Sequence, residues 1–145
     1  MKNHLWKIEW RDAMSVGIDE IDEDHKIFAG LINDLNEAIV ERMDLEELKR
    51  LLDLIVDDAV QHFDHEERLF AQWHYPDAPV HALRHAEAIK DVLAIKARVE
   101  NSDLQTEWIE GGMEIKDILI NHLITEDMKY AKYYRDNLKG REATF

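Results

Sequence analysis

The sequence predicts an all-α protein: an antiparallel up-down-up-down four-helix bundle with an N-terminal extended arm. Apolar residues recur at helical spacing in four successive segments. The 145 residues include only two prolines and five glycines, which favours long helices over many short strands. The connections between the predicted helices are short, and short connections join antiparallel neighbours. We expect residues 1–145 to form one domain, with the arm over about 1–19 and the bundle over about 20–139.

The first two helices are predicted from apolar faces and a capping signal. Residues 21–40 form the first helix, with an apolar face of Ile21, Phe28, Leu31, Ile32, Leu35 and Ile39. The second helix begins after Asp44, because Asp44 followed three residues later by Glu47 has the form of a capping box. It continues to about Gln72 and carries Leu48, Leu51, Leu52, Ile55, Val56, Ala59 and Phe63 on one face.

The second half of the chain follows the same pattern. Pro76 and Pro79 break the second helix, and a third helix is predicted over residues 80–99. A turn and cap at residues 101–103 precede a fourth helix with the apolar residues Trp108, Ile115, Ile118, Leu119, Leu123 and Ile124. Gly111 and Gly112 weaken its first half. A short terminal helix, or an extension, follows over residues 128–138.

Composition excludes several classes of function. The net charge of −14 leaves no basic footprint for nucleic acid, and an anionic membrane surface would repel the chain. The sequence has no apolar run long enough for a membrane span. Its first residues also lack the continuous apolar stretch of a secretory signal. Cysteine is absent, so thiolate metal sites and disulfides are excluded. We therefore expect a cytoplasmic protein that binds neither nucleic acid nor membrane.

The placement of the histidines predicts a metal site. His62 and Glu66 are four residues apart on the second helix, so both side chains lie on one helical face, one turn apart. His81 and His85 repeat this spacing on the third helix. With His25 on the first helix and His122 on the fourth, every helix offers at least one imidazole. Side chains that project inward from facing helices build metal sites in bundles, and imidazole with carboxylate suits iron, zinc, copper and manganese.

Asp127 does not fit a regular helix. It follows His122 by five residues, which leaves the two side chains about 140° apart on a straight helix. Either the helix ends or widens there, or the carboxylate reaches round from a local break. A π-type bulge is one such widening.

Taken together, these segments resemble the hemerythrin family, and most closely its single-domain bacterial members. The resemblance covers about residues 10–135 and rests on motifs at family spacing. They are Trp10 with Val16-Gly17-Ile18, Ile21-Asp22-Glu23-Asp24-His25-Lys26, His62-Phe63-Asp64-His65-Glu66-Glu67, Tyr75-Pro76, His81-Ala82-Leu83-Arg84-His85, and His122-Leu123-Ile124-Thr125-Glu126-Asp127. Three positions depart from the usual pattern without removing a ligand type: Asp24, Phe70 and Ile118.

The resemblance implies two iron ions per chain (Fe²⁺/Fe³⁺), joined by a solvent-derived oxo or hydroxo bridge. His81, His85 and His122 would then bind one iron, and His25 and His62 the other. Glu66 and Asp127 would bridge both. The second iron would have one ligand fewer, which leaves one position for dioxygen.

We therefore expect reversible dioxygen binding for oxygen storage, transport or delivery, without enzymatic activity. Leu119 and Leu123, with Phe28 or Phe63, are the hypothesised walls of a dry oxygen pocket. Glu67, Asp58 and backbone carbonyls are candidate acceptors for the ligand imidazoles. His4, His65 and His74 lie outside the pattern. His65 follows His62 by three residues and could point near the site, but it is interpreted as solvent-facing.

Three other functions stay open at this point. The same site would suit a sensor or scavenger of oxygen or nitric oxide. A di-iron oxidase or iron-storage protein of the ferritin type is a second alternative, although that class uses Glu-x-x-His pairs. The third is an acidic helical interaction module without metal. The oligomeric state, monomer or small homo-oligomer, is not determined by these patterns.

Overall fold

The computed structural model of the chain describes residues 6–138, so His4 lies outside the described residues. Within that range the protein is helical and contains no strand, which confirms the predicted all-α class. The elements are the 3₁₀ turn η1 (Asp12–Met14), α1 (Asp19–Val40), α2 (Leu45–Trp73), α3 (Ala78–Glu100), α4 (Gln105–Asn121), the π-helix η2 (His122–Asp127) and α5 (Met128–Asn137).

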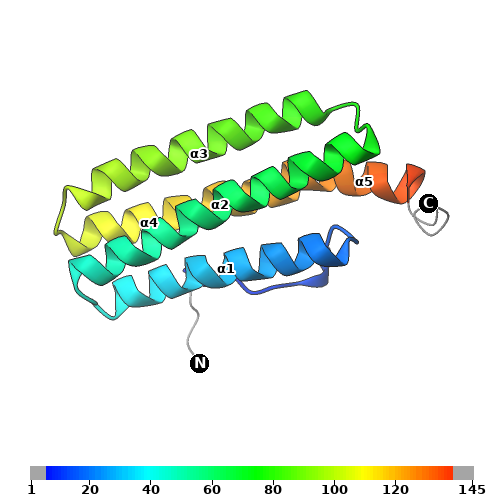
Figure 1. Cartoon of the computed structure of the whole chain (residues 1–145). Coiled ribbons are helices and arrows are strands. Elements are labelled where there is room, and N and C mark those ends of the chain that lie inside the picture. Colours follow the sequence, from blue (N-terminus) through cyan, green and yellow to red (C-terminus); the bar gives the residue numbers. More distant parts are fainter. Residues whose placement is uncertain (1–5, 139–145) are drawn as a thin grey trace.

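The four long helices lie side by side as a bundle (Figure 1). Each packs against the next along the chain, and α4 closes the ring by packing against α1. The colours in Figure 1 show that successive helices run in opposite directions, as their short connections require. The π-helix continues α4 directly into α5, which extends beyond the end of the bundle. The predicted four-helix bundle is therefore confirmed.

Local signals account for where the helices begin and end, and the first three differ from prediction by at most two residues at either end. At the start of α2, the Asp44 side chain accepts a hydrogen bond of 2.9 Å from the Glu47 amide. At its end, His74 adopts the left-handed conformation with φ 53°. The Tyr75 amide then donates to the Phe70 carbonyl at 3.0 Å, as in a Schellman motif. The exposed His74 thus belongs to the helix end.

The two glycines of α4 allow close packing against neighbouring helices. The helix runs unbroken through Gly111 and Gly112, and both are buried. A Cβ atom at Gly112 would lie 2.1 Å from Oδ1 of the buried Asn36 on α1. A Cβ at Gly111 would lie 2.6 Å from a methyl group of Val99 on α3. Glycine disfavours a helix, but at these two positions it allows α4 to pack closely against α1 and α3.

Two apolar clusters fill the core and lie on either side of a polar layer. One extends along the bundle and includes Phe28, Phe63 and Leu119. The other lies near the arm and α5 and includes Ile21, Phe70, Leu123 and Tyr130. Along α1, His25 falls between Ile21 and Phe28; along α2, Glu66 falls between Phe63 and Phe70; near the end of α4, His122 falls between Leu119 and Leu123. The helical repeat therefore places these polar groups between the two clusters.

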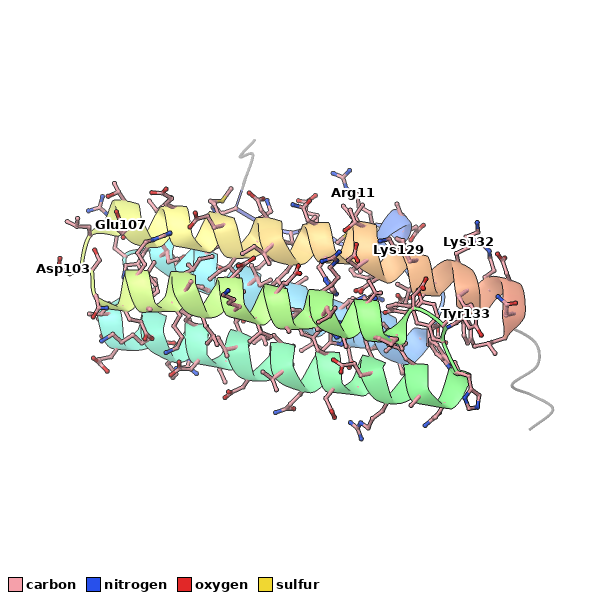
Figure 2. All side chains as sticks on the ribbon, turned by 90° about the horizontal axis from the view of Figure 1, so that it is seen from above. Arg11, Asp103, Glu107, Lys129, Lys132 and Tyr133 are labelled. Carbon is pink, nitrogen blue, oxygen red and sulfur yellow. The ribbon has the colours of Figure 1, made fainter. Side chains whose placement is uncertain are left out.

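The described part of the arm, residues 6–18, runs alongside α1 (Figure 1). It is extended, as predicted, apart from the turn η1, and Gly17 supplies a positive φ of 78° in the predicted turn region. Trp10 packs the arm against the cluster near α5. Charged side chains such as Arg11, Lys129 and Lys132 are exposed on the outside of the molecule (Figure 2). No helix in the described range has an apolar stretch that would cross a membrane.

Candidate metal centre

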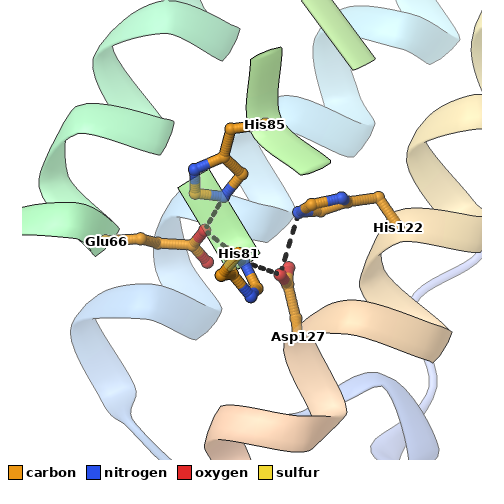
Figure 3. A group of neighbouring side chains, drawn as sticks. All are labelled: Glu66, His81, His85, His122 and Asp127. Atoms are coloured by element: carbon orange, nitrogen blue, oxygen red, sulfur yellow. Dashed lines mark hydrogen bonds and ion pairs between the residues drawn. The ribbon is translucent and has the colours of Figure 1, made fainter. Parts of the chain in front are cut away.

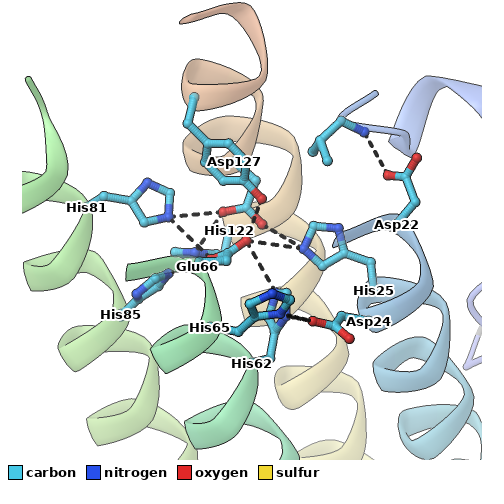
Figure 4. Close-up of polar contacts among 12 residues, drawn as sticks. Asp22, Asp24, His25, His62, His65, Glu66, His81, His85, His122 and Asp127 are labelled. Atoms are coloured by element: carbon cyan, nitrogen blue, oxygen red, sulfur yellow. Dashed lines mark hydrogen bonds and ion pairs between the residues drawn. The ribbon is translucent and has the colours of Figure 1, made fainter. Parts of the chain in front are cut away.

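All seven side chains predicted as ligands converge inside the bundle (Figure 4). Each is less than one-tenth exposed. One comes from α1, two from α2, two from α3 and two from the π-helix: His25, His62, Glu66, His81, His85, His122 and Asp127. Buried polar groups normally have partners, so such a concentration marks a functional cluster.

The cluster divides into two groups that share both carboxylates. His81, His85 and His122 form one group with Glu66 and Asp127 (Figure 3). The second group comprises His25 and His62 with the same two carboxylates. Within each group the potential ligand atoms lie within 4.8 Å of one another. The division into three and two histidines matches the one that the family resemblance implied.

Each shared carboxylate turns one oxygen to each group. For Glu66, Oε1 lies 2.9 Å from Nε2 of His85, whereas Oε2 lies 3.3 Å from Nε2 of His62. For Asp127, Oδ1 lies 3.1 Å from Nε2 of both His81 and His122. The other oxygen, Oδ2, lies 3.1 Å from Nε2 of His25. Both carboxylates are thus oriented to bridge two adjacent cation positions.

The π-helix explains how Asp127 reaches the cluster. The residues from His122 to Asp127 form a six-residue π-helix, whose wider turn brings side chains five apart onto one face. The sequence had left this widening open among other irregularities. Within the segment the Thr125 hydroxyl donates to the Asn121 carbonyl at 2.6 Å. A side chain thus satisfies a carbonyl at the point where the helical repeat changes.

The electrostatics of the metal-free protein pair imidazolium with carboxylate. Burial lowers the pKa of His25, but the neighbouring Asp127 and Glu66 carboxylates outweigh it and raise that pKa to about 9. The same balance raises the pKa of His81 to about 9. Burial raises the pKa of Glu66 and of Asp127, yet the surrounding histidines hold both well below the usual range. The site therefore keeps its carboxylates ionised, as metal ligation requires.

Two ligand histidines have carboxylate partners on their outer ring nitrogens. Nδ1 of His85 lies 2.8 Å from Glu67, one of the predicted acceptors. Nδ1 of His62 lies 3.3 Å from Asp24, which takes the place of Asp58, one of the candidate acceptors. Asp24 also lies 2.7 Å from Nδ1 of His65, whose side chain is only 30% exposed. His65 is therefore a partnered residue at the rim, which corrects its interpretation as solvent-facing.

Tyr130 is a site residue that the sequence patterns missed. Its hydroxyl donates a hydrogen bond of 2.5 Å to Oε2 of Glu66, and both side chains are fully buried. Burial and the adjacent Glu66 raise the pKa of Tyr130 well above its usual value, so the phenol stays a donor. The sequence feature that could have identified Tyr130 is its position three residues after Asp127, which places both side chains on the same helical face.

The donor set fits metal ions. All five imidazoles turn Nε2 toward the shared carboxylates, yet Nε2 of His25, His62, His81 and His122 makes no hydrogen bond within the described residues. Oδ1 of Asp127 is likewise unpartnered and buried. Buried groups left without hydrogen bonds are costly, and a cation between them would satisfy their lone pairs. Imidazole and carboxylate without thiolate suit iron, zinc, copper and manganese.

A small apolar cavity of about 30 Å³ adjoins the two-histidine group. His25 and His62 form its polar side, together with His122 and Asp127. The predicted wall residues all line it: Phe28, Phe63, Leu119 and Leu123. The volume exceeds that needed for a single water-sized particle, about 10–15 Å³. The cluster therefore opens onto an apolar space that both histidines of the smaller group line.

A bundle that buries five imidazoles and two shared carboxylates has the features of the helical proteins that bind metal between facing helices. Comparison with known proteins specifies the family. Residues 16–134 match the family described as "Hemerythrin HHE cation binding domain". The chain belongs to the hemerythrin family, and the resemblance predicted from its motifs is confirmed.

Individual relatives agree with this assignment. The chain is 35% identical to a hemerythrin-like protein of Naegleria gruberi over 121 residues, 83% of this chain and 88% of the relative. It is 28% identical to a bacteriohemerythrin of Stenotrophomonas maltophilia over 89% of this chain and 82% of the relative. It is 29% identical to a myohemerythrin of Theromyzon tessulatum over 84% of this chain and 89% of the relative.

Proposed function

We propose that this protein binds dioxygen reversibly at a pair of iron ions and catalyses no reaction. The observation that carries the proposal is the division of each shared carboxylate between a three-histidine and a two-histidine group. Two iron ions held there would supply the open coordination position and the two electrons that dioxygen binding requires. His81, His85 and His122 would hold one ion, and His25 and His62 the other. Glu66 and Asp127 would bridge them.

The protein's own residues account for selectivity and reversibility. The cavity beside His25 and His62 is lined mainly by apolar side chains, which admit a small neutral molecule and disfavour water. Carboxylates behind His62 and His85 fix the orientation of those rings. Tyr130 holds one oxygen of Glu66 in place. A ligand set with five imidazoles and two carboxylates also differs from the carboxylate-rich sites of ferritin-like oxidases.

The direct test is metal analysis with absorption spectra under air and after degassing. We expect about two iron ions per chain, one for each ligand group, and a visible band that disappears on degassing and returns with air. A colourless protein without iron would overturn the proposal in favour of a metal-free interaction module. Sustained oxidation of an added substrate would favour the oxidase instead.

A ligand variant with a matched control sharpens the test. His81→Ala removes one of the three imidazoles in the larger group, so the iron content should fall. His74→Asn is the control, because His74 is exposed at the end of α2 and asparagine tolerates its left-handed backbone. The control should keep its iron. Equal iron contents in the two variants would contradict the role of His81.

A further inference from the structure

The cavity beside His25 and His62 is closed on its outer side by the N-terminal arm. Three residues of the arm line it: Ile8, Trp10 and Met14. The remaining lining comes from α1, α2, α4 and the π-helix. Ile8 is buried in the main apolar cluster, and Trp10 and Met14 are half-buried. A small molecule that leaves the cavity on this side must therefore pass the arm.

Side chains of α1 form hydrogen bonds with the arm at three places, the first of them from the Asn36 amide to the Trp6 carbonyl at 3.3 Å. Near the cavity, Asn33 accepts a hydrogen bond of 2.6 Å from the Ile8 amide and donates one of 2.9 Å to the Ile8 carbonyl. Farther along, Asp22 accepts hydrogen bonds of 2.5 Å from the Ser15 hydroxyl and 2.9 Å from the Val16 amide. Figure 4 shows Asp22 beside the start of α1, apart from the histidine cluster.

The Asn33 and Asp22 attachments differ in what they hold. The Asn33 amide pairs with both polar groups of one residue in the cavity wall, as a neighbouring strand would. The Asp22 attachment fixes residues 15 and 16, next to Gly17 with its positive φ of 78°. Without Asn33, residues 7–14 lose their attachment at Ile8 and can move outward, while Asn36 still holds Trp6 and Asp22 still holds residues 15 and 16. The polar groups of Ile8 would then pair with water.

We propose that the arm is the gate of the ligand cavity and that Asn33 is the positioning residue that keeps it closed. The proposal rests on the proposed function, because it takes the cavity as the dioxygen site. Opening of residues 7–14 admits and releases dioxygen, and closure excludes water. Asn33 touches neither the cluster nor the cavity, so it acts only through the backbone of Ile8.

The test compares three variants of the iron-loaded protein. Asn33→Ala removes both hydrogen bonds, and Asn33→Asp keeps only an acceptor for the Ile8 amide. Gln105→Ala is the matched control: its side chain donates to the Ile39 carbonyl at 2.5 Å, linking α4 to α1 at the opposite end of the bundle. Three quantities are measured: hydrogen exchange at the Ile8 amide, xenon exchange between cavity and solvent by NMR, and the rates of dioxygen binding and release.

Loss of two hydrogen bonds should raise the open fraction of the arm about tenfold or more. In Asn33→Ala, amide exchange at Ile8, xenon exchange and both dioxygen rates should rise by similar factors. The dioxygen affinity should hardly change, because a gate alters both rates equally. Asn33→Asp should lie between the two, and Gln105→Ala should leave all three quantities unchanged. A side chain that only stabilised the fold would not raise both dioxygen rates while leaving the dioxygen affinity unchanged.

The outcomes separate this proposal from the function on which it rests. Faster exchange at Ile8 with unchanged xenon and dioxygen rates would show that small molecules enter elsewhere, and the gate would be abandoned. Unchanged hydrogen exchange at the Ile8 amide would show that Asn33 does not keep the arm closed. If the protein failed to bind dioxygen at all, the proposed function would fall, while xenon exchange would still report whether the arm controls access. If Asn33→Ala did not fold, Asn33→Asp would give the same answer with a smaller effect.

Discussion

Tyr130 shows how much a single side chain outside the ligand set contributes to the site. Glu66 is fully buried and has to present one oxygen to each half of the cluster. The Tyr130 hydroxyl bonds Oε2, the oxygen that faces His25 and His62. It therefore orients the oxygen of Glu66 that faces the smaller histidine group.

Tyr130→Phe should keep the iron but hold it less firmly. The change removes the donor to a buried carboxylate, which we expect to cost about 1–3 kcal/mol of unfolding free energy. Iron should also be lost faster to a chelator. Chemical denaturation and the rate of iron release check the two effects.

Tyr133→Phe is the control for this change. Tyr133 donates to the carbonyl of Trp73 at 3.4 Å in a partly buried position, outside the cluster. Its loss should cost clearly less stability and leave iron release unchanged. Equal effects of the two substitutions would show that the hydrogen bond to Glu66 contributes no more to stability or iron retention than the hydrogen bond of Tyr133.

Helix α4 and its continuation show how an element adapts to the site. Its two glycines allow contact with α1 and α3, and the π-helix that follows changes the helical phase before α5 begins. The change of phase places Asp127 beside His122, and Tyr130 follows on the same face of the continued helix. The irregular part of this element is thus where two of the ligand side chains are found.

Gly112→Ala should destabilise the bundle. Its Cβ would lie 2.1 Å from Oδ1 of Asn36, whose amide nitrogen donates to the Gly112 carbonyl at 3.4 Å and to the Trp6 carbonyl at 3.3 Å. Overpacking of this kind costs about 1–3 kcal/mol. Thermal unfolding of the variant should show a lower midpoint.

Gly30→Ala on α1 is the opposite case. A Cβ there meets no atom within 4 Å, and the residue is helical. Alanine should therefore stabilise the protein by up to about 1 kcal/mol, because it restricts the unfolded chain and favours the helix. A Gly112→Ala protein that is as stable as the Gly30→Ala protein would contradict the packing argument for Gly112.

In the molecule as a whole, a charged layer lies between two apolar clusters, so its protonation affects folding. The folded metal-free protein holds protons on His25 and His81 up to about pH 9, whereas the unfolded chain releases them near pH 6.5. The stabilisation that they contribute is therefore complete below pH 6.5 and is lost as the pH rises to about 9. Glu66 and Asp127 act in the opposite sense, because their stabilisation is lost in acid.

We therefore predict that the metal-free protein becomes less stable between pH 6.5 and 9, by at most about 1.4 kcal/mol per pH unit for each proton released. The iron-loaded protein should lack this fall, since bound metal has already displaced the protons. Denaturation of both forms across this range is the measurement. A metal-free protein with constant stability over that range would show that His25 and His81 are not protonated in the fold.

Much of this arrangement is visible in the order of residues alone. Apolar periodicity, the cap at Asp44 and the prolines after α2 are local signals, so the helices could be predicted to within two residues at most ends. The spacing of His62 with Glu66, and of His81 with His85, fixes common faces by helical geometry. Even the irregular position of Asp127 was apparent, because five residues do not fit a regular turn.

What local signals leave open are pairings between segments far apart in the chain. Asp24 rather than Asp58 faces His62 across 38 positions, Tyr130 meets Glu66 across 64, and Asn33 reaches Ile8 across 25. Each pairing depends on how two elements are rotated and offset against each other. Sequence spacing sets the face of a helix on which a side chain lies. Packing of the helices sets which side chain on the next element it meets, and here that packing places two carboxylates between both histidine groups and the arm over the cavity.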